Sequence, residues 1–520
     1  MKASKTKEKN VEIEKSDHQE VSLVILISLF ILLFIILRRA WMTDDAYITL
    51  RTVDNFVNGF GLTWNIAERV QVFTHPLWMF VLSAFYFFTR EPYYTTIYLS
   101  VFFTLFSIVL LFKYFAKSTL LVMLATTVLA LSRAFVDYST SGLENPLSYL
   151  LVVIFFIIFL YHLEQINHTT LVWLSLIASL GILNRMDYFL IFILPLLYCL
   201  WLYHDWKGIL YLLLGQIPFL VWEVFSFLYY GYLVPNTAFA KLGYGFAMVV
   251  LKQGMTYFIN SIVNDPLTMF FIGVGIVLPW LIKSIDIRLK VLSLSICAYL
   301  LYVLSIGGDF MSGRFFSIPL VCALIVIITI AKSFTNQPLL LLIGLALLLG
   351  FSIPWNTLTL NTAETSLGNN IIADERIYYF QSTGLIYQLD YRAGHDFIWE
   401  TMGKDFKQRG IKVTAAKAIG MFGYYAGPGV FIVDQEALAD PLLSHLPPQI
   451  EPTFHPGHLD RSVPDGYMET LRSGSNLITN KNIAEYYEKV KMITRGEIFN
   501  LERISTIIQM NLGKYNYLLN

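Results

Sequence analysis

The sequence has little cysteine and little charge. Only three of its 520 residues are cysteines, Cys199, Cys297 and Cys322, and all three lie in apolar runs. With no cysteine in the polar C-terminal part, a disulfide framework is excluded there, and we expect the three to pack between helices. Charged residues make up 14% of the chain, against about 25% in a soluble globular protein. Since 56% of the residues are hydrophobic, the composition predicts a membrane protein with several spans.

Several chemical signatures are also missing. The 37 basic and 37 acidic residues balance, and the sequence shows no basic cluster of the kind that binds nucleic acid. We therefore expect membrane lipid, and no nucleic acid, among the partners. The HExxH, CxxC and Walker patterns are absent too. No cofactor or metal site is expected from a local motif, although a divalent metal held by residues far apart in the sequence is not excluded.

Long apolar runs fill the chain from residue 21 to residue 354. In the hydrocarbon core each run must be a helix, because its backbone groups have no water to bond. Several runs are short for a full span, so we expect some to be tilted, interfacial or re-entrant. The twelve runs are 21–37, 76–89, 97–112, 119–132, 146–161, 170–183, 188–203, 208–229, 267–282, 291–306, 315–331 and 338–353.

Charges in the loops predict the orientation. The loops at 205–207 and 283–290 and the residue Lys332 carry basic side chains, which favour the cytoplasmic side. This places residues 1–20 in the cytoplasm as a tail and everything after 354 outside. It also predicts about eleven crossings, with one early run not crossing fully. The segments then expected outside are 40–75, which is the first outer loop, and 140–146, 184–187, 230–265 and 307–314.

The composition changes after about Trp355. Polar residues, glycines and short mixed segments replace the long runs, and residues 355–520 are enough for one soluble domain. We predict a mixed α/β fold, with strands at 413–421 and 430–434 around a glycine-rich turn at 423–429. Segments 483–493 and 495–510 fit either two helices or a helix and a strand.

Two adjacent aspartates, Asp44 and Asp45, follow the first apolar run. Carboxylates at a membrane boundary are costly to half-bury, so their position suggests a function. A structural role is also possible, because acidic side chains at the start of a predicted helix at 46–56 would favour its N-terminus. The sequence alone leaves both roles open.

The segment from Asp44 to Trp78 resembles the first outer loop of the GT-C glycosyltransferases related to the mycobacterial terminal arabinofuranosyltransferase. His75 replaces the usual Asn of that pattern, and Met186 replaces a Pro in a later one. Several pieces match in order along nearly the whole chain. They are Asp44–Ile48, Arg51, Asn58–Asn65, Glu68–Val70, Thr74–Trp78, Ser141–Glu144, Arg185–Asp187, Pro235–Thr237, Ala240–Lys241, Gly307–Phe315, Asp434, Leu438–Pro441 and Pro456–His458.

The resemblance implies a GT-C fold and a sugar transferase in the plasma membrane. The donor would be a polyprenyl-phosphate-linked sugar, and the acceptor a hydroxyl of a surface glycan, lipid or protein, as in cell wall biosynthesis. It also implies chemistry at the outer face and an inverting single displacement. The sugar of the family, arabinofuranose, is not implied for this chain.

Asp44 matches the leading aspartate of the family pattern, so we predict it as the base that deprotonates the acceptor. Adjacent residues do not share one helix face, and Asp45 is expected to orient the base or bind sugar hydroxyls. The leaving phosphate needs cations, for which Arg offers a bidentate fork and Lys a point charge. The candidates for donor binding are Arg314, Lys241, Arg69 and Arg185, with His75 as a secondary one.

Three more carboxylates and two indoles complete the predicted site. Glu144, Asp187 and Asp309 are candidates for binding sugar hydroxyls, and Trp64 and Trp78 for stacking on sugar faces. Structural roles compete for each. The acids could instead pair with Arg185 or Arg314, the cations could snorkel to the interface, and the indoles could anchor helices there.

A transporter or flippase of lipid-linked sugars is the alternative function. Such a protein would show broken helices and polar residues meeting near the middle of the membrane. Here the suggestive charges gather at one set of predicted helix ends, which favours chemistry at the surface.

Overall fold

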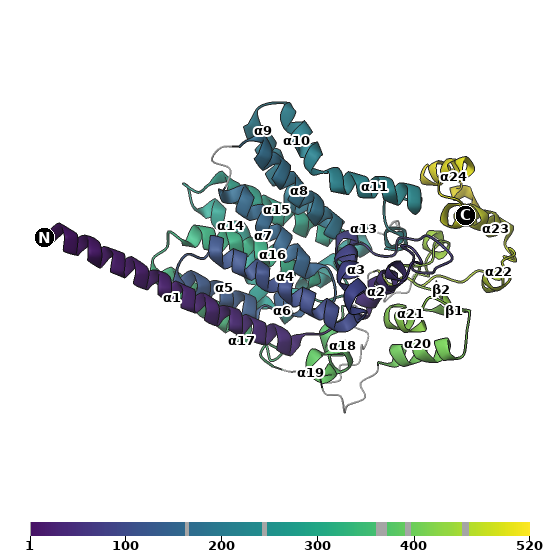
Figure 1. Cartoon of the computed structure of the whole chain (residues 1–520), viewed down its shortest axis with the longest axis horizontal. Coiled ribbons are helices and arrows are strands. Elements are labelled where there is room, and N and C mark those ends of the chain that lie inside the picture. The colour runs from purple at the N-terminus through teal and green to yellow at the C-terminus, as the bar shows by residue number, and fades with distance from the viewer. Residues whose placement is uncertain are drawn as a thin grey trace.

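Almost all regular structure in the chain is helical (Figure 1). The computed structural model describes residues 2–161, 166–241, 247–359, 372–389, 397–449 and 457–519, with the backbone alone for 2–18 and Ala247. The side chains of the predicted tail therefore lie outside the described residues, as does Pro456 of the matched pattern.

Each of the twelve apolar runs is helical, as predicted. The helices are α1 (Lys2–Arg39), α3 (Pro76–Thr89), α4 (Pro92–Tyr114), α5 (Thr119–Leu131), α7 (Asn145–Tyr161), α8 (His168–Asn184), α9 (Phe189–Tyr203), α10 (Lys207–Gly215) and α11 (Ile217–Tyr229), which share one run, α14 (Pro266–Leu281), α15 (Ile287–Ser305), α16 (Ser317–Ala331) and α17 (Asn336–Phe351). A further helix, α13 (Ala247–Asn264), lies within the segment 230–265, outside the twelve runs.

The chain is a multi-pass membrane protein. Among the described residues, five helical segments are long and apolar enough to span a bilayer, or up to seven if two bent pairs each count as one. The pairs are α10–α11, bent by 61°, and α13–α14, bent by 110°. Five shorter apolar helices, α3, α5, α7, α8 and α17, accompany them. The figure of about eleven crossings stays a prediction.

Helix α16 forms the centre of the membrane part. Nearly all of its side chains are buried, whereas the other long spans expose a face. It lies in the middle of the bundle in Figure 1. Gly275 of α14 lies against Ala323 of α16, so closely that a Cβ there would be 2.5 Å from the Ala323 Cβ. Small residues at such crossings let membrane helices pack backbone to backbone.

The C-terminal part lies beside the first outer loop, at the right in Figure 1. Strands β1 (Val413–Ala416) and β2 (Phe431–Asp434) pair in parallel, with Val413 opposite Phe431. The other elements here are α2 (Asp44–Val57), α18 (Glu375–Thr383), α19 (Leu385–Gln388), α20 (Ile398–Gln408), α21 (Gly420–Ala426), α22 (Tyr467–Ser473), α23 (Lys481–Arg495) and α24 (Leu501–Asn511).

The local predictions for this part are partly corrected. The strand expected at 413–421 ends at Ala416, and the turn expected at 423–429 is wrong over its first half, because helix α21 continues to Ala426. The strand at 430–434 is confirmed by β2. Of the two segments left open, 483–493 lies within helix α23, and 495–510 is helical from Leu501 onward, in α24.

A buried arginine ties the outer loop to the C-terminal part. Arg51 of α2 donates from Nη1 to the carbonyl of Gly423 and from Nη2 to that of Val430, at 2.6 and 2.8 Å. Its guanidinium lies over the ring of Trp64, 4.2 Å from the centroid. Residues of segment 40–75 and of the C-terminal part share one apolar core, so the C-terminal part packs directly on the segment that contains α2.

Candidate active site

Glu144 is the centre of a buried charge cluster. Its carboxylate is 2.6 Å from Nη1 of Arg185, 3.2 Å from Nη2 of Arg314 and 3.5 Å from Nδ1 of His75. Two further carboxylates hold the arginines from outside, with Asp187 at 2.8 Å from Arg185 and Asp309 at 3.5 Å from Arg314. Six of the predicted site residues therefore come together in one cluster. They are Glu144, Arg185, Arg314, His75, Asp187 and Asp309.

Turns at helix ends place these side chains. Glu144 precedes α7 and follows Gly142, whose φ of +85° and contact with Ala46 of α2 leave no room for a side chain. Arg185 directly follows α8, and Arg314 follows Gly313, with a φ of +79°. Glycine adopts these left-handed conformations without steric cost, so three segments distant in sequence can converge on one point.

The cluster is electrostatically asymmetric. Burial alone would raise the pKa of Glu144, but Arg314 and Arg185 outweigh it and hold that pKa well below its usual range. Burial lowers the pKa of His75 to about 4 against the opposing effect of Glu144. His75 is therefore neutral near pH 7, and its Nε2 makes a 2.8 Å hydrogen bond with Thr49. The two guanidinium groups carry the positive charge of the cluster.

Asp44 is engaged with the C-terminal domain. Its Oδ2 accepts from the backbone N–H of Gly420 at 3.0 Å, and its Oδ1 from that of Met421 at 2.7 Å. It therefore binds the first N–H groups of α21, and no side-chain bond caps α2 itself. Burial raises the pKa of Asp44 to about 7 despite these two donors.

Asp45 has a more open environment than Asp44. Its side chain is partly exposed, and no hydrogen bond to it occurs within the described part of the chain. It lies within electrostatic reach of Arg314 and His75 in the cluster, and of Glu375 and Glu436 in the C-terminal part. The charge of Asp45 therefore acts on residues of both groups.

Four predicted site residues lie elsewhere. Arg69 donates to the carbonyls of Tyr229 and Gly496, so it links the outer loop to the C-terminal helices. Lys241 is exposed at the end of the short helix α12 (Asn236–Lys241), with its stem against Gly457. Trp64 and Trp78 are 1% and 0% exposed. In this structure neither indole can reach a sugar, because one packs under Arg51 and the other bonds to the carbonyl of Gly142.

Sequence reasoning missed two acidic residues. Glu375, at the start of α18, accepts a 3.0 Å bond from the Thr43 hydroxyl, and burial raises its pKa well above the usual range. Glu436 follows β2 and lies 3.5 Å from Nε2 of His458. Nothing local marks Glu375, which is 332 residues from Thr43. For Glu436 the signal was indirect, since the matched pattern includes Asp434 and His458 on either side of it.

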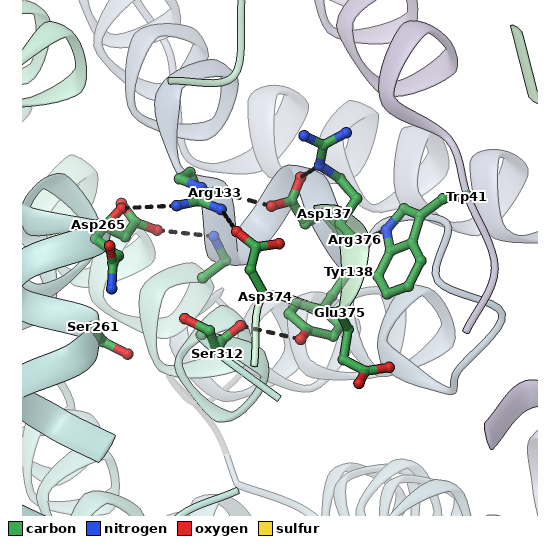
Figure 2. Close-up of a pocket in the computed structure, with 13 residues that line it drawn as sticks. Trp41, Arg133, Asp137, Tyr138, Ser261, Asp265, Ser312, Asp374, Glu375 and Arg376 are labelled. Atoms are coloured by element: carbon green, nitrogen blue, oxygen red, sulfur yellow. Dashed lines mark hydrogen bonds and ion pairs between the residues drawn. The ribbon is translucent and has the colours of Figure 1, made fainter. Parts of the chain in front are cut away.

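A small polar cavity is lined by side chains that include Arg133, Asp374 and Glu375 (Figure 2). Arg133 forms an ion pair there with Asp374, and Asp137 with Arg39 at 2.8 Å. Figure 2 shows Glu375 at its edge, below Trp41 and Tyr138. The cavity walls join α6 (Arg133–Asp137) to α18 and so fix the position of Glu375.

No metal centre is formed by the described side chains, since no three His, Cys, Asp or Glu groups among them are arranged to hold an ion. The acids of the cluster are instead paired with arginines or backbone N–H groups. The chemistry open to the site as built is proton transfer to a carboxylate and binding of an anion by guanidinium groups.

Comparison with known proteins confirms the resemblance seen in the sequence. No family model matches the chain. A terminal beta-(1->2)-arabinofuranosyltransferase of Mycobacterium tuberculosis is 26% identical over 403 residues, 67% of this chain and 63% of the relative. One of Corynebacterium glutamicum is 25% identical over 391 residues, 66% of this chain and 56% of the relative. The chain thus matches about three fifths of the length of these relatives.

Among solved structures, ArnT from Cupriavidus metallidurans bound to undecaprenyl phosphate superposes with a TM-score of 0.48 at 12% identity. The superposition covers 81% of this chain and 87% of that one.

Proposed function

We propose that this chain is a membrane glycosyltransferase. It transfers a glycosyl group from a polyprenyl-phosphate sugar to a hydroxyl of a glycan, lipid or protein acceptor at the outer face of the membrane. The two relatives named as arabinofuranosyltransferases support the reaction class. The observation that carries the proposal is the buried cluster in which Arg185 and Arg314 both pair with Glu144, at 2.6 and 3.2 Å.

The reaction needs a base on one side and cations on the other. The acceptor oxygen attacks the anomeric carbon as its proton passes to a carboxylate, and the bond from that carbon to the phosphate oxygen breaks. The released polyprenyl phosphate takes up the negative charge, which Arg185 and Arg314 are placed to stabilise. Nε of Arg314 is buried and has no hydrogen-bond partner among the described residues, so one donor of this guanidinium is left unsatisfied.

The contacts favour Asp45 as the base and Asp44 as a positioning residue. Both oxygens of Asp44 already accept backbone N–H groups, and its side chain is only 7% exposed. Asp45 is partly exposed and engages no described hydrogen-bond donor, so an acceptor hydroxyl can approach it. The assignment of the base to Asp44, taken from the family pattern, is the competing one.

The test compares matched asparagine variants. Purified full-length protein in nanodiscs is supplied with a panel of polyprenyl-phosphoryl sugars and with an octyl oligo-arabinofuranoside. We expect Asp45→Asn to lower kcat by about 100-fold to 10,000-fold, the usual contribution of a general base, at an unchanged unfolding temperature. Asp405→Asn, in an exposed pair with Arg409, serves as the control. Full activity of Asp45→Asn with loss only in Asp44→Asn would return the base to Asp44, and no transfer by the native chain from any donor would reject the reaction class.

Transport of lipid-linked sugars is the second candidate, because the two bent helix pairs are of the kind transporters use. Proteoliposomes loaded with the same donors distinguish the two functions. A transferase forms product without moving donor between leaflets, whereas a flippase moves donor and forms no product.

A further inference from the structure

We propose that Glu436 and His458 of the C-terminal domain bind and orient the acceptor hydroxyl beside Asp45. The domain then completes the reaction centre and selects a neutral, hydroxyl-rich ligand there. This inference rests on the proposed function and assigns the acceptor side of the same site.

The pair sits opposite the arginine cluster. Oε2 of Glu436 is 3.5 Å from Nε2 of His458, and both side chains keep a minor part of their surface open, 17% and 23%. The edge of the His458 ring meets Phe310, with centroids 4.2 Å apart at 83°. Phe310 follows Asp309, which pairs with Arg314. One short loop of the membrane part therefore contacts the arginine cluster through Asp309 and the C-terminal pair through Phe310.

A braced turn holds Glu436 in place. Fully buried Asp434 accepts the backbone N–H of Glu436 at 3.0 Å and that of Ala439 at 2.8 Å. Between them Ala437 adopts a φ of +63°, which a residue with a side chain rarely does. Such conformations persist only where the surroundings enforce them.

The bracing comes from the membrane part. The Asn236 side-chain amide donates to the carbonyls of Ala437 and Leu438, both at 3.0 Å, and its oxygen accepts from the Ser444 hydroxyl. Asn236 is the central residue of the Pro-Asn-Thr segment that the sequence comparison singled out, and these bonds give that segment a physical role. It fixes the Glu436 turn relative to the membrane helices.

The charges around the two halves of the site differ. Arg185 and Arg314 form one wall and suit a phosphate. The groups whose charges act on Glu436 are the carboxylates of Asp434, Asp45 and Asp460 and the ammonium of Lys241, so this side of the site has no excess of positive charge to hold a phosphate. A neutral sugar hydroxyl suits it, because it can donate to one oxygen and accept from another group.

Two further observations agree with a hydroxyl ligand. Burial, followed by the nearby Asp434 and Asp45, raises the pKa of Glu436 to about 9. Near pH 7 it is therefore protonated and can both donate to and accept from a sugar oxygen, while Asp45 takes the proton. In addition, Oδ2 of the buried Asp309 has no hydrogen-bond donor among the described residues, only the Arg314 ion pair at 3.5 Å.

The experiment separates acceptor binding from chemistry. Octyl oligo-arabinofuranoside and octyl oligomannoside are titrated into nanodisc-embedded full chains without donor, and transfer is then measured with donor present. We expect Glu436→Ala and His458→Ala each to raise the acceptor Kd and KM by about 10-fold to 100-fold, as for loss of a hydrogen bond in a buried site. The donor KM should change less than about 2-fold. Glu469→Ala, on the exposed surface of the same domain, is the matched control.

The outcomes distinguish this inference from the proposed function. Native protein that binds an acceptor probe but transfers no sugar would reject the function and leave the binding comparison valid. Unchanged acceptor binding in both variants at native unfolding temperature would overturn the inference, as would native protein that binds neither probe. If one variant fails to fold, the other decides. Asp45→Asn should show the opposite pattern to the acceptor-binding variants, with a lower kcat and an unchanged acceptor Kd.

Discussion

At the scale of single residues, Asp44 differs from its neighbour because its carboxylate is buried at the start of α21. Its pKa is raised from 3.8 to about 7, so the folded state binds a proton more tightly than the unfolded state. The stabilising effect is full below about pH 4 and is lost as the pH rises through about 7. Asp44 should therefore make the folded chain less stable at pH 7.5 than at pH 4.5.

The variant Asp44→Asn tests this effect, since an amide does not titrate. Unfolding temperature in detergent, followed from pH 4.5 to pH 7.5, should fall more in the native chain than in the variant. Asp434 and Asp440, whose pKa values burial also raises to about 7, contribute equally to both curves. Parallel curves would show that Asp44 titrates alike in the folded and unfolded states.

Glu144 shows the opposite dependence, because its pKa is lowered in the folded state. Its stabilising effect is present above pH 4.5 and is lost as the pH falls further. Replacing Glu144 by Gln removes the carboxylate that the two buried guanidinium groups share. We expect a loss of about 3–5 kcal/mol in the free energy of unfolding at pH 7, measured by denaturation in detergent. The exposed control Glu469→Gln should change the free energy of unfolding by no more than about 1 kcal/mol. Equal effects of the two variants would contradict a stabilising role of Glu144 in the cluster.

The grouping of the charged residues around Glu144 was easier to predict from the sequence than the contacts of the aromatic residues. Glu144, Arg185 and Arg314 each follow a turn at a predicted outer helix end, so they share one level of the bundle. The roles of Arg69 and Trp64 depend on partners from the C-terminal domain, hundreds of residues away. No local pattern shows which carbonyl accepts an arginine or which guanidinium covers an indole, so these contacts could not be predicted from the sequence.

At the scale of elements, α21 depends on its close approach to α2. A Cβ on Gly420 would lie 1.9 Å from the carbonyl oxygen of Asp44. Gly420→Ala must therefore push α21 away and weaken both N–H bonds to Asp44. We expect lower transfer activity and an unfolding free energy reduced by about 1–3 kcal/mol, as for overpacking. Activity and thermal unfolding measure the two effects.

The matched control is Gly429→Ala, nine residues further along the chain. No atom lies within 4 Å of a Cβ at Gly429, and its backbone φ lies outside the left-handed region. Its effect should stay within about 0.5 kcal/mol. If the two alanine variants behave alike, the contact between α2 and α21 has no part in holding the domain.

The contact between α2 and α21 also explains why the helices were predicted correctly in the membrane part but not throughout the C-terminal part. Apolar runs in a membrane must be helices, so all twelve were found from hydropathy alone. Segment 420–426 contains two glycines, which have low helix propensity, and it was read as a strand end and a turn. It is helical because Asp44, 376 residues earlier, supplies acceptors for its first N–H groups and because α20 packs along it. Tertiary contacts of this range leave no trace in the local sequence.

At the scale of the whole molecule, the proposed chemistry requires the C-terminal domain and the first outer loop to lie on one side of the membrane. Arg51 and Asn236 bond both segments together within the described structure, so a single orientation decides the location of the entire site. The basic loop between α14 and α15 should then lie on the opposite, cytoplasmic side.

Cysteine labelling in intact cells tests that orientation. Ser473 in α22 and Ser284 between α14 and α15 are both exposed, whereas Cys199 and Cys322 are buried and Cys297 is partly so. We expect a membrane-impermeant maleimide to label Ser473→Cys in intact cells but Ser284→Cys only after permeabilisation, with the native chain as the background control. The reverse pattern would put Asp45 in the cytosol. Because Arg51 and Asn236 join the loop to the domain, no partial rearrangement could then return the aspartate pair to the outer face, and a donor presented there would never reach it.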